Sequence, residues 1–205
     1  MTKPPQYSTR TGTLPPTEGA SAIPRFWSWF EENQEECATL VRKDAGRALD
    51  KIGYELARID PNLVVEMGID AKHTELIVSA DGISSLFPLV EQTVAAAPSI
   101  ANWTVIAFRQ PKPDIVEASY NGLVVTHGDV RIIAHNSSVL VDVTFYVKGL
   151  TSTEDPRIGA LFVLIDGLIG EYNTATRIGA MGFQPLSAAP PNARAFAELK
   201  EILQL

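Results

Sequence analysis

The chain has 205 residues, 45% of them apolar and 20% charged, so it can bury a sizeable core and is not intrinsically disordered throughout. Its single cysteine, Cys37, excludes an internal disulfide and a cysteine-based zinc cluster. The net charge of −7 argues against a nucleic-acid partner, because nucleic-acid binding depends on clustered lysine and arginine.

Residues 1–13 are polar and lack the apolar core of a signal peptide, which predicts a cytoplasmic protein. The longest apolar stretch, 158–169, is interrupted by glycine and aspartate and is too short to span a bilayer, so no membrane partner is expected. Four prolines and few apolar residues predict a disordered tail over 1–22. A single α+β domain is predicted over 23–205.

Two helical patterns open the predicted domain. Apolar residues recur at helical spacing over 26–41, after Pro24, and again over 48–59, before Pro61. The spacing leaves open whether these are two helices or one helix bent near Gly46. The glutamates in 31–36 precede the basic residues in 42–47, an order that a helix dipole favours.

The segment that follows predicts a strand pair, a helix and a third strand. Alternating patterns at 63–67 and 75–79 predict two strands joined by a turn. A helix capped by Ser84 or Ser85 should end at Pro98. Residues 103–109 are apolar on both faces, which favours a central strand.

Four further strands are predicted at 115–120, 123–125, 130–135 and 139–147. In the last of these, one face should be buried and the other, with Asp142 and Thr144, should be exposed. Val139, Val141, Val143, Phe145 and Val147 should share the apolar face, with Val141, Val143 and Phe145 buried.

Asp155 as N-cap and Pro156 as first residue predict a helix to about residue 173. A strand at 181–183 and a short helix from 193 should follow. Because strands and helices do not alternate regularly along the chain, the expected class is α+β, with a mostly antiparallel sheet and helices packed mainly on one face.

The motifs of common enzyme classes, including P-loop, dinucleotide-binding, nucleophile-elbow and zinc-protease motifs, are missing from the sequence. No cofactor or metal site is predicted. His127 and His135 flank Asp129, where a metal or acid–base site is conceivable, but turn or surface histidines are favoured. Cys37 lies on the apolar stripe of the first helix, which favours a buried structural thiol over a nucleophile.

Five residues are the best candidates for a ligand-binding site, and none is assigned a catalytic role. Asp81 lies between a strand and a helix, and Arg109 ends a strand where it can hold a carboxylate or phosphate. Asn33 lies on an apolar stripe, which favours a structural role through hydrogen bonds. Asp166 lies beside small residues of a helix, which favours helix packing over ligand binding. The full set is Asn33, Asp81, Trp103, Arg109 and Asp166.

The aromatic cluster at 26–30 contains one residue that leaves the core stripe. Trp29 and Phe30 fit the stripe, whereas Trp27 points away from it. Trp27 therefore covers a second layer or lies in an interface, where tryptophan is enriched.

The opening Phe-Trp-Ser-Trp-Phe-Glu-Glu-Asn at 26–33, Ser-Ala-Asp-Gly at 79–82, Leu-Phe-Pro-Leu-Val at 86–90, Trp103 with Ala-Phe-Arg at 107–109, and Asp166 through Gly-Glu-Tyr at 170–172 resemble a family of uncharacterised bacterial proteins. The resemblance covers about residues 26–185. It implies a bacterial origin and transfers no activity or catalytic residue.

The favoured hypothesis is a non-catalytic cytoplasmic protein that binds a protein partner, as an immunity protein does with a basic toxin. The acidic charge and the expected solvated sheet face motivate it. The alternative is a small enzyme or ligand-binding domain whose five candidate residues converge on one pocket. The oligomeric state is left open.

Overall fold

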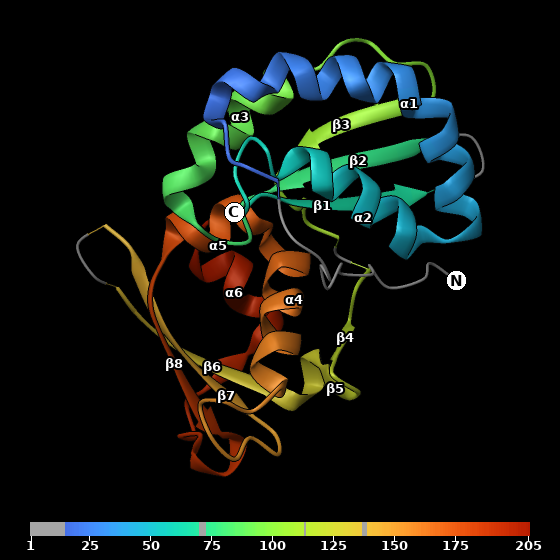
Figure 1. Cartoon of the computed structure of the whole chain (residues 1–205). Coiled ribbons are helices and arrows are strands. Elements are labelled where there is room, and N and C mark those ends of the chain that lie inside the picture. Colours follow the sequence, from blue (N-terminus) through green and yellow to red (C-terminus); the bar gives the residue numbers. More distant parts are fainter. Residues whose placement is uncertain (1–14, 70–72, 113, 137–138) are drawn as a thin grey trace. The chain divides into compact units, whose positions relative to one another are not determined.

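The computed structural model describes residues 15–69, 73–112, 114–136 and 139–205 (Figure 1). Its contacts divide the chain into two compact units, unit 1 up to Arg109 and unit 2 over Gln110–Leu205. Helices accompany open, mostly antiparallel sheets, which confirms the predicted α+β class. The single domain expected over 23–205 stays a prediction.

Unit 1 contains two packed helices, α1 (Ile23–Lys43) and α2 (Ala45–Leu56), so the question of one helix or two is answered. The break comes at Asp44, whose side chain accepts a hydrogen bond from the Arg47 N–H at 3.1 Å and so caps α2. Trp27 is 3% exposed and donates from Nε1 to the Thr93 carbonyl of α3 (Phe87–Ala95) at 2.8 Å. Of the two roles expected for Trp27, the structure shows the second layer.

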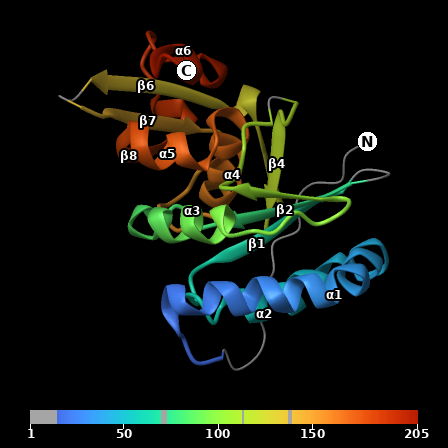
Figure 2. The same cartoon turned by 90° about the horizontal axis from the view of Figure 1, so that it is seen from above.

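The sheet of unit 1 has the order β1-β2-β3, with β1 (Val64–Ile69) antiparallel to β2 (Thr74–Ser79) and β3 (Trp103–Ala107) parallel to β2. Helix α3 makes the crossover and lies alongside these strands (Figure 2). The expected central position for 103–109 is wrong, since β3 is an edge strand. A run that is apolar on both faces does not distinguish an edge from a centre when its side chains are only partly buried, as they are in β3.

Order begins before the predicted boundary at residue 23. Residues 1–14 of the expected tail lie outside the described residues. The remainder contains a 3-10 helix, η1 (Gly19–Ala22), and the Glu18 N–H donates to the Arg58 carbonyl at 2.6 Å. Pro15 and Ala22 are buried, so this segment is packed on unit 1.

Unit 2 contains a hairpin, β4 (Glu117–Tyr120) and β5 (Leu123–Thr126), and a sheet of order β8-β7-β6-β9. The hairpin packs beside α4 (Figure 2). In the sheet, β6 is antiparallel to β7 and β9, and β8 is parallel to β7. The four strands are β6 (Val130–Asn136), β7 (Val141–Val147), β8 (Ile178–Pro185) and β9 (Arg194–Ala195).

The alternation predicted for β7 is confirmed from Val143 onward, but Val141 is only partly buried and the opposite face is not fully exposed. Val143 and Phe145 are at most 1% exposed, whereas Asp142 and Thr144 on the opposite face are half-buried. The expectation for Val139 is wrong, because Val139 precedes the strand and is 88% exposed. A residue outside the ladder is not bound by its alternation.

Two helices, α4 (Arg157–Ile169) and α6 (Leu199–Ile202), contribute residues to the core that contains Phe145. The helix α5 (Glu171–Arg177) packs beside α4 (Figure 1). The single helix expected to residue 173 is wrong, because Gly170 adopts φ 84°, a conformation that ends α4 and favours glycine. No single helix of the described residues is long and apolar enough to cross a membrane, and α4 with α5 would meet that test only together, across a bend of 99°.

Short 3-10 helices complete the chain: η2 (Ser84–Leu86), η3 (His127–Asp129), η4 (Leu186–Ala188) and η5 (Phe196–Glu198).

Candidate functional site

Three of the five candidate residues have separate environments. Asn33 donates from Nδ2 to the Trp29 carbonyl at 2.8 Å and accepts from Lys51 Nζ at 3.3 Å, so it ties α1 to α2. Trp103 is 8% exposed and packs edge-on against Phe30, with ring centroids 4.9 Å apart. Asp166 belongs to α4 in unit 2.

The structure brings the other two candidates, Asp81 and Arg109, together. Because β2 and β3 are parallel, their carboxyl ends lie at the same end of the sheet. Asp81 follows β2 and Arg109 follows β3, so both residues lie at that end. Arg109 Nη2 lies 2.6 Å from Asp81 Oδ1, and Arg109 Nε bonds to Glu66 Oε1 of β1. The backbone on both sides is unusual, since Asp81 has φ 50° and Phe108 has φ 63°.

The environment of these three charged groups decides what they can do. The Arg109 and Glu66 side chains are 13% and 5% exposed, whereas the Asp81 side chain is 62% exposed. Arg109 thus holds two carboxylates of its own chain, and the cluster keeps one net negative charge. The group that this cluster presents to solvent is therefore the Asp81 carboxylate, which suits a cation better than the anion expected from Arg109 alone.

Asp81 also borders a cavity of about 300 Å³ in unit 1. Its other lining residues are mainly apolar and come from α2, β1 and the loops beside them: Leu49, Pro61, Asn62, Val64, Val65 and Ile83. An apolar wall with a single carboxylate is the composition of a small-ligand site.

Glu66 was missed by the sequence reasoning. It is a buried carboxylate, 4% exposed, within a strand whose neighbours are apolar. That isolated charge in an otherwise apolar strand was the available signal, because a buried carboxylate requires a cationic or hydrogen-bonding partner.

A second candidate is the acidic face of α1, defined by Glu31, Glu32, Glu35 and Glu36, all of them exposed. Glu36 pairs with Lys51 at 2.7 Å. The other three make no ion pair or side-chain hydrogen bond with the described residues. The helix begins at Ile23, so these glutamates lie beyond its first turn and the expected stabilisation by the dipole is not available to them.

A groove of about 280 Å³ runs beside the acidic face. Glu35, Ala38 and Arg42 line one wall from α1, and the loop before β3, with Asn102 and Trp103, lines the other. Trp103, which sequence reasoning grouped with Asp81, therefore belongs to this second surface.

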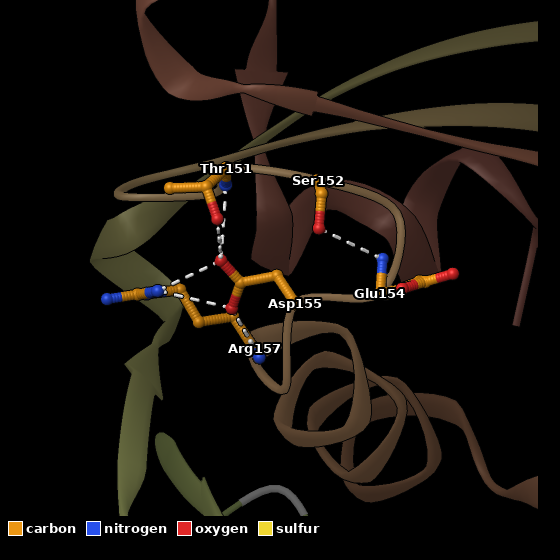
Figure 3. Close-up of polar contacts among 5 residues, drawn as sticks. All are labelled: Thr151, Ser152, Glu154, Asp155 and Arg157. Atoms are coloured by element: carbon orange, nitrogen blue, oxygen red, sulfur yellow. Dashed lines mark hydrogen bonds and ion pairs between the residues drawn. The ribbon is translucent and has the colours of Figure 1, made fainter.

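The polar cluster around Asp155 is structural (Figure 3). Asp155 is 5% exposed and accepts hydrogen bonds from Thr151 N and Oγ1 at 3.1 and 2.9 Å, and from Arg157 N and Nη1 at 3.0 and 3.1 Å. These bonds, led by the one from the Arg157 N–H, lower the pKa of Asp155 to about 2. The predicted N-cap position is wrong by one residue, because Pro156 is the N-cap of α4, but the Asp155 carboxylate still holds the first helical N–H, that of Arg157.

His127 does not form the conceivable site with Asp129. Asp129 accepts from Thr126 Oγ1 at 2.6 Å and pairs with Lys148 at 3.2 Å. The His127 ring packs edge-on against Phe196 at 4.9 Å, and its buried Nε2 has no hydrogen-bond partner among the described residues. Burial lowers the pKa of His127, partly offset by a hydrogen bond to the backbone of Ile115.

The described residues contain no group of three or more His, Cys, Asp or Glu side chains arranged to hold a metal ion. Comparison with known proteins adds no assignment to these surfaces: no family model matches the chain, and neither a curated protein nor a solved structure matches it.

Proposed function

We propose that this protein acts by binding a basic protein partner through the acidic face of α1, as a non-catalytic cytoplasmic protein of a bacterial cell. The observation that carries the proposal is the cluster of three exposed glutamates, Glu31, Glu32 and Glu35, without ion pairs in the described structure. An immunity-type protein that neutralises a basic toxin is one protein class with this property.

The stability of α1 does not account for the cluster. Glu31 with Glu35, and Glu32 with Glu36, are like-charged pairs at i,i+4 spacing, each unfavourable by roughly 0.2–0.5 kcal/mol. A lysine- or arginine-rich partner surface would turn these repulsions into attractions. It would also gain contact area from the adjacent groove, which Glu35, Ala38 and Asn102 help to line.

A charge-matched pair of variants tests the proposal. Glu31→Gln/Glu32→Gln/Glu35→Gln removes three charges from the acidic face, and Asp114→Asn/Glu117→Gln/Glu154→Gln removes three exposed charges from unit 2. Binding of a lysine-rich peptide is measured by calorimetry at two salt concentrations, and host proteins are captured at low salt.

We expect the α1 variant to lose the peptide and any stoichiometric basic partner, and the unit 2 variant to retain both. Binding to the natural chain should weaken as salt rises, because exposed charges are screened. Equal loss in both variants would show that only net charge matters and would refute a docking face on α1.

The cavity beside Asp81 supports a second candidate function, binding of a small organic cation in a ligand-binding domain or enzyme. An exposed carboxylate held by Arg109 next to an apolar wall suits an alkylammonium or guanidinium group. Chemical-shift changes on adding butylammonium should centre on Asp81 and Ile83 and disappear in Asp81→Asn. Persistence of the same shift changes in Asp81→Asn, or equal changes over all exposed carboxylates, would eliminate this candidate.

A further inference from the structure

The strand β8 forms an open edge of the unit 2 sheet. In the part of the chain that the structure describes, β8 pairs with β7 on one side only. Its sequence, Ile-Gly-Ala-Met-Gly-Phe-Gln-Pro, contains no charged residue. Edge strands of proteins that remain monomeric are usually protected by charged side chains, proline, β-bulges, covering segments or short length. In β8 the register shift against β7 is confined to the start of the strand and the proline to its last position, Pro185, so the stretch between them is open.

The other outer strands of the two larger sheets differ from β8. The edge strand β1 contains Glu66, and β9 has two residues, one of them Arg194. The strand β3 is also uncharged but has five residues against the eight of β8. β8 is therefore the longest uncharged edge among these strands.

An apolar surface adjoins this edge. Phe162 of α4 is 40% exposed, and its ring centroid lies 5.9 Å from that of Phe183 on β8. Phe183 in turn stacks on the core residue Phe145 at 6.0 Å, and Met181 is partly buried beside the same core. The β8 edge surface is thus the open backbone of β8 together with Phe162, Met181 and Phe183.

We propose that the β8 edge surface binds a second copy of this chain, with the two β8 strands antiparallel about a twofold axis perpendicular to the sheet. The resulting sheet would run β9-β6-β7-β8 and then β8-β7-β6-β9 of the partner. Such a contact is isologous and closed, which limits assembly to a dimer.

Charge and symmetry favour a second copy as the occupant. Two chains of net charge −7 repel each other, and an uncharged strand lets their backbones approach without facing like-charged side chains. A perpendicular twofold axis places both α4 helices on the same face of the joined sheet. The exposed Phe162 rings of the two copies then flank the junction and lose solvent contact.

The test is the molar mass of the full chain in solution, measured by light scattering over a concentration series. We expect twice the chain mass of 22.3 kDa for the natural sequence. Ala180→Lys/Gln184→Lys places charges at two exposed positions of β8, and Phe162→Arg removes the aromatic ring. Each variant should weaken dimerisation at least tenfold, and hydrogen exchange of the β8 amides should accelerate as dilution separates the copies.

Val124→Lys is the matched control, because Val124 is a 55% exposed strand residue of the β4–β5 hairpin, and it should remain dimeric. Circular dichroism confirms that each variant is folded, and the two β8-edge variants act on different elements, so misfolding of one leaves the other decisive. A natural chain that is monomeric at its highest soluble concentration would overturn the proposal. So would a dimer that both variants leave intact, or larger open assemblies.

Discussion

Unit 1 and unit 2 share one arrangement of three consecutive strands. In each unit an antiparallel pair, β1–β2 or β6–β7, is followed by a helical crossover and a third strand, β3 or β8, parallel to the second. The loop after the second strand carries an aspartate bonded to an arginine in both cases. In unit 1 this is Asp81 with Arg109, and in unit 2 it is Asp155 with Arg157.

The two aspartates nevertheless differ in what remains open to them. The Asp155 side chain is 2% exposed and its oxygens are occupied by backbone and side-chain donors, whereas the Asp81 side chain is 62% exposed and borders a cavity. The loop after the second strand thus holds a carboxylate bonded to the first turn of a helix in one unit and an accessible carboxylate in the other. Topology fixes where a side chain is placed, and its hydrogen-bond partners decide whether it is available for binding.

The largest expected effect is loss of stability when a charge is placed in the second strand of either unit, β2 or β7. Val143→Asp in β7 and Leu76→Asp in β2 each place an unpaired charge in a core position that is at most 1% exposed. Each should destabilise by more than about 4 kcal/mol and prevent soluble expression at normal levels. Thr144→Asp, on the half-buried face of β7, should remain soluble.

If some Val143→Asp protein is recovered folded, hydrogen exchange can compare the protection of amides in unit 1 with that in unit 2. Loss of protection in unit 2 alone would show two units that unfold independently. Loss in both would support the predicted single domain over 23–205. A soluble Val143→Asp protein with a normal melting temperature would contradict the register of β7.

The next effect separates the buried from the exposed ion pair of Arg109. Arg109→Met leaves the Glu66 carboxylate, 4% exposed, without its guanidinium partner and should cost about 3–5 kcal/mol in urea denaturation. Asp81→Asn should cost less than about 1 kcal/mol, because that partner is exposed. The double variant Glu66→Leu/Arg109→Met should recover most of the loss, and failure to recover it would mean that Arg109 acts through other contacts.

The pH dependence of stability should reveal the contribution of the Asp155 carboxylate. The pKa of Asp155 is lowered from 3.8 to about 2, so its ionised form stabilises the fold above pH 4, and that contribution is lost as the pH falls from about 4 through 2. Over this range the melting temperature should fall more steeply with decreasing pH in the natural chain than in Asp155→Asn. An equal slope in both proteins would show that the carboxylate is as well solvated when folded as when unfolded.

The smallest expected effect concerns His127. Burial lowers its pKa below 6.5, so the unfolded chain takes up a proton first and stability should fall as the pH drops below about 6.5. His127→Gln should reduce this slope between pH 7 and 5. A slope that is the same in the natural chain and in His127→Gln would contradict this role of the imidazole.

Local patterns predicted most of the element order, including the alternation of β7 and the start of α4 to within one or two residues. What they missed depends on distant parts of the chain. The edge position of β3 follows from pairing with β2, and the role of Arg109 follows from Glu66, which lies 43 residues earlier. The break at Gly170 was local but ambiguous, because a glycine inside a helical pattern is compatible with a continuous helix.

The chain's single thiol offers a way to measure local opening of unit 1. Cys37 is fully buried in α1, and burial raises its pKa, so a thiol-specific reagent can react only when that part of unit 1 opens. Cys37 is therefore an intrinsic probe of local opening in the natural chain. The rate of Cys37 labelling reports the opening of the helix that bears the acidic face, without the introduction of any probe.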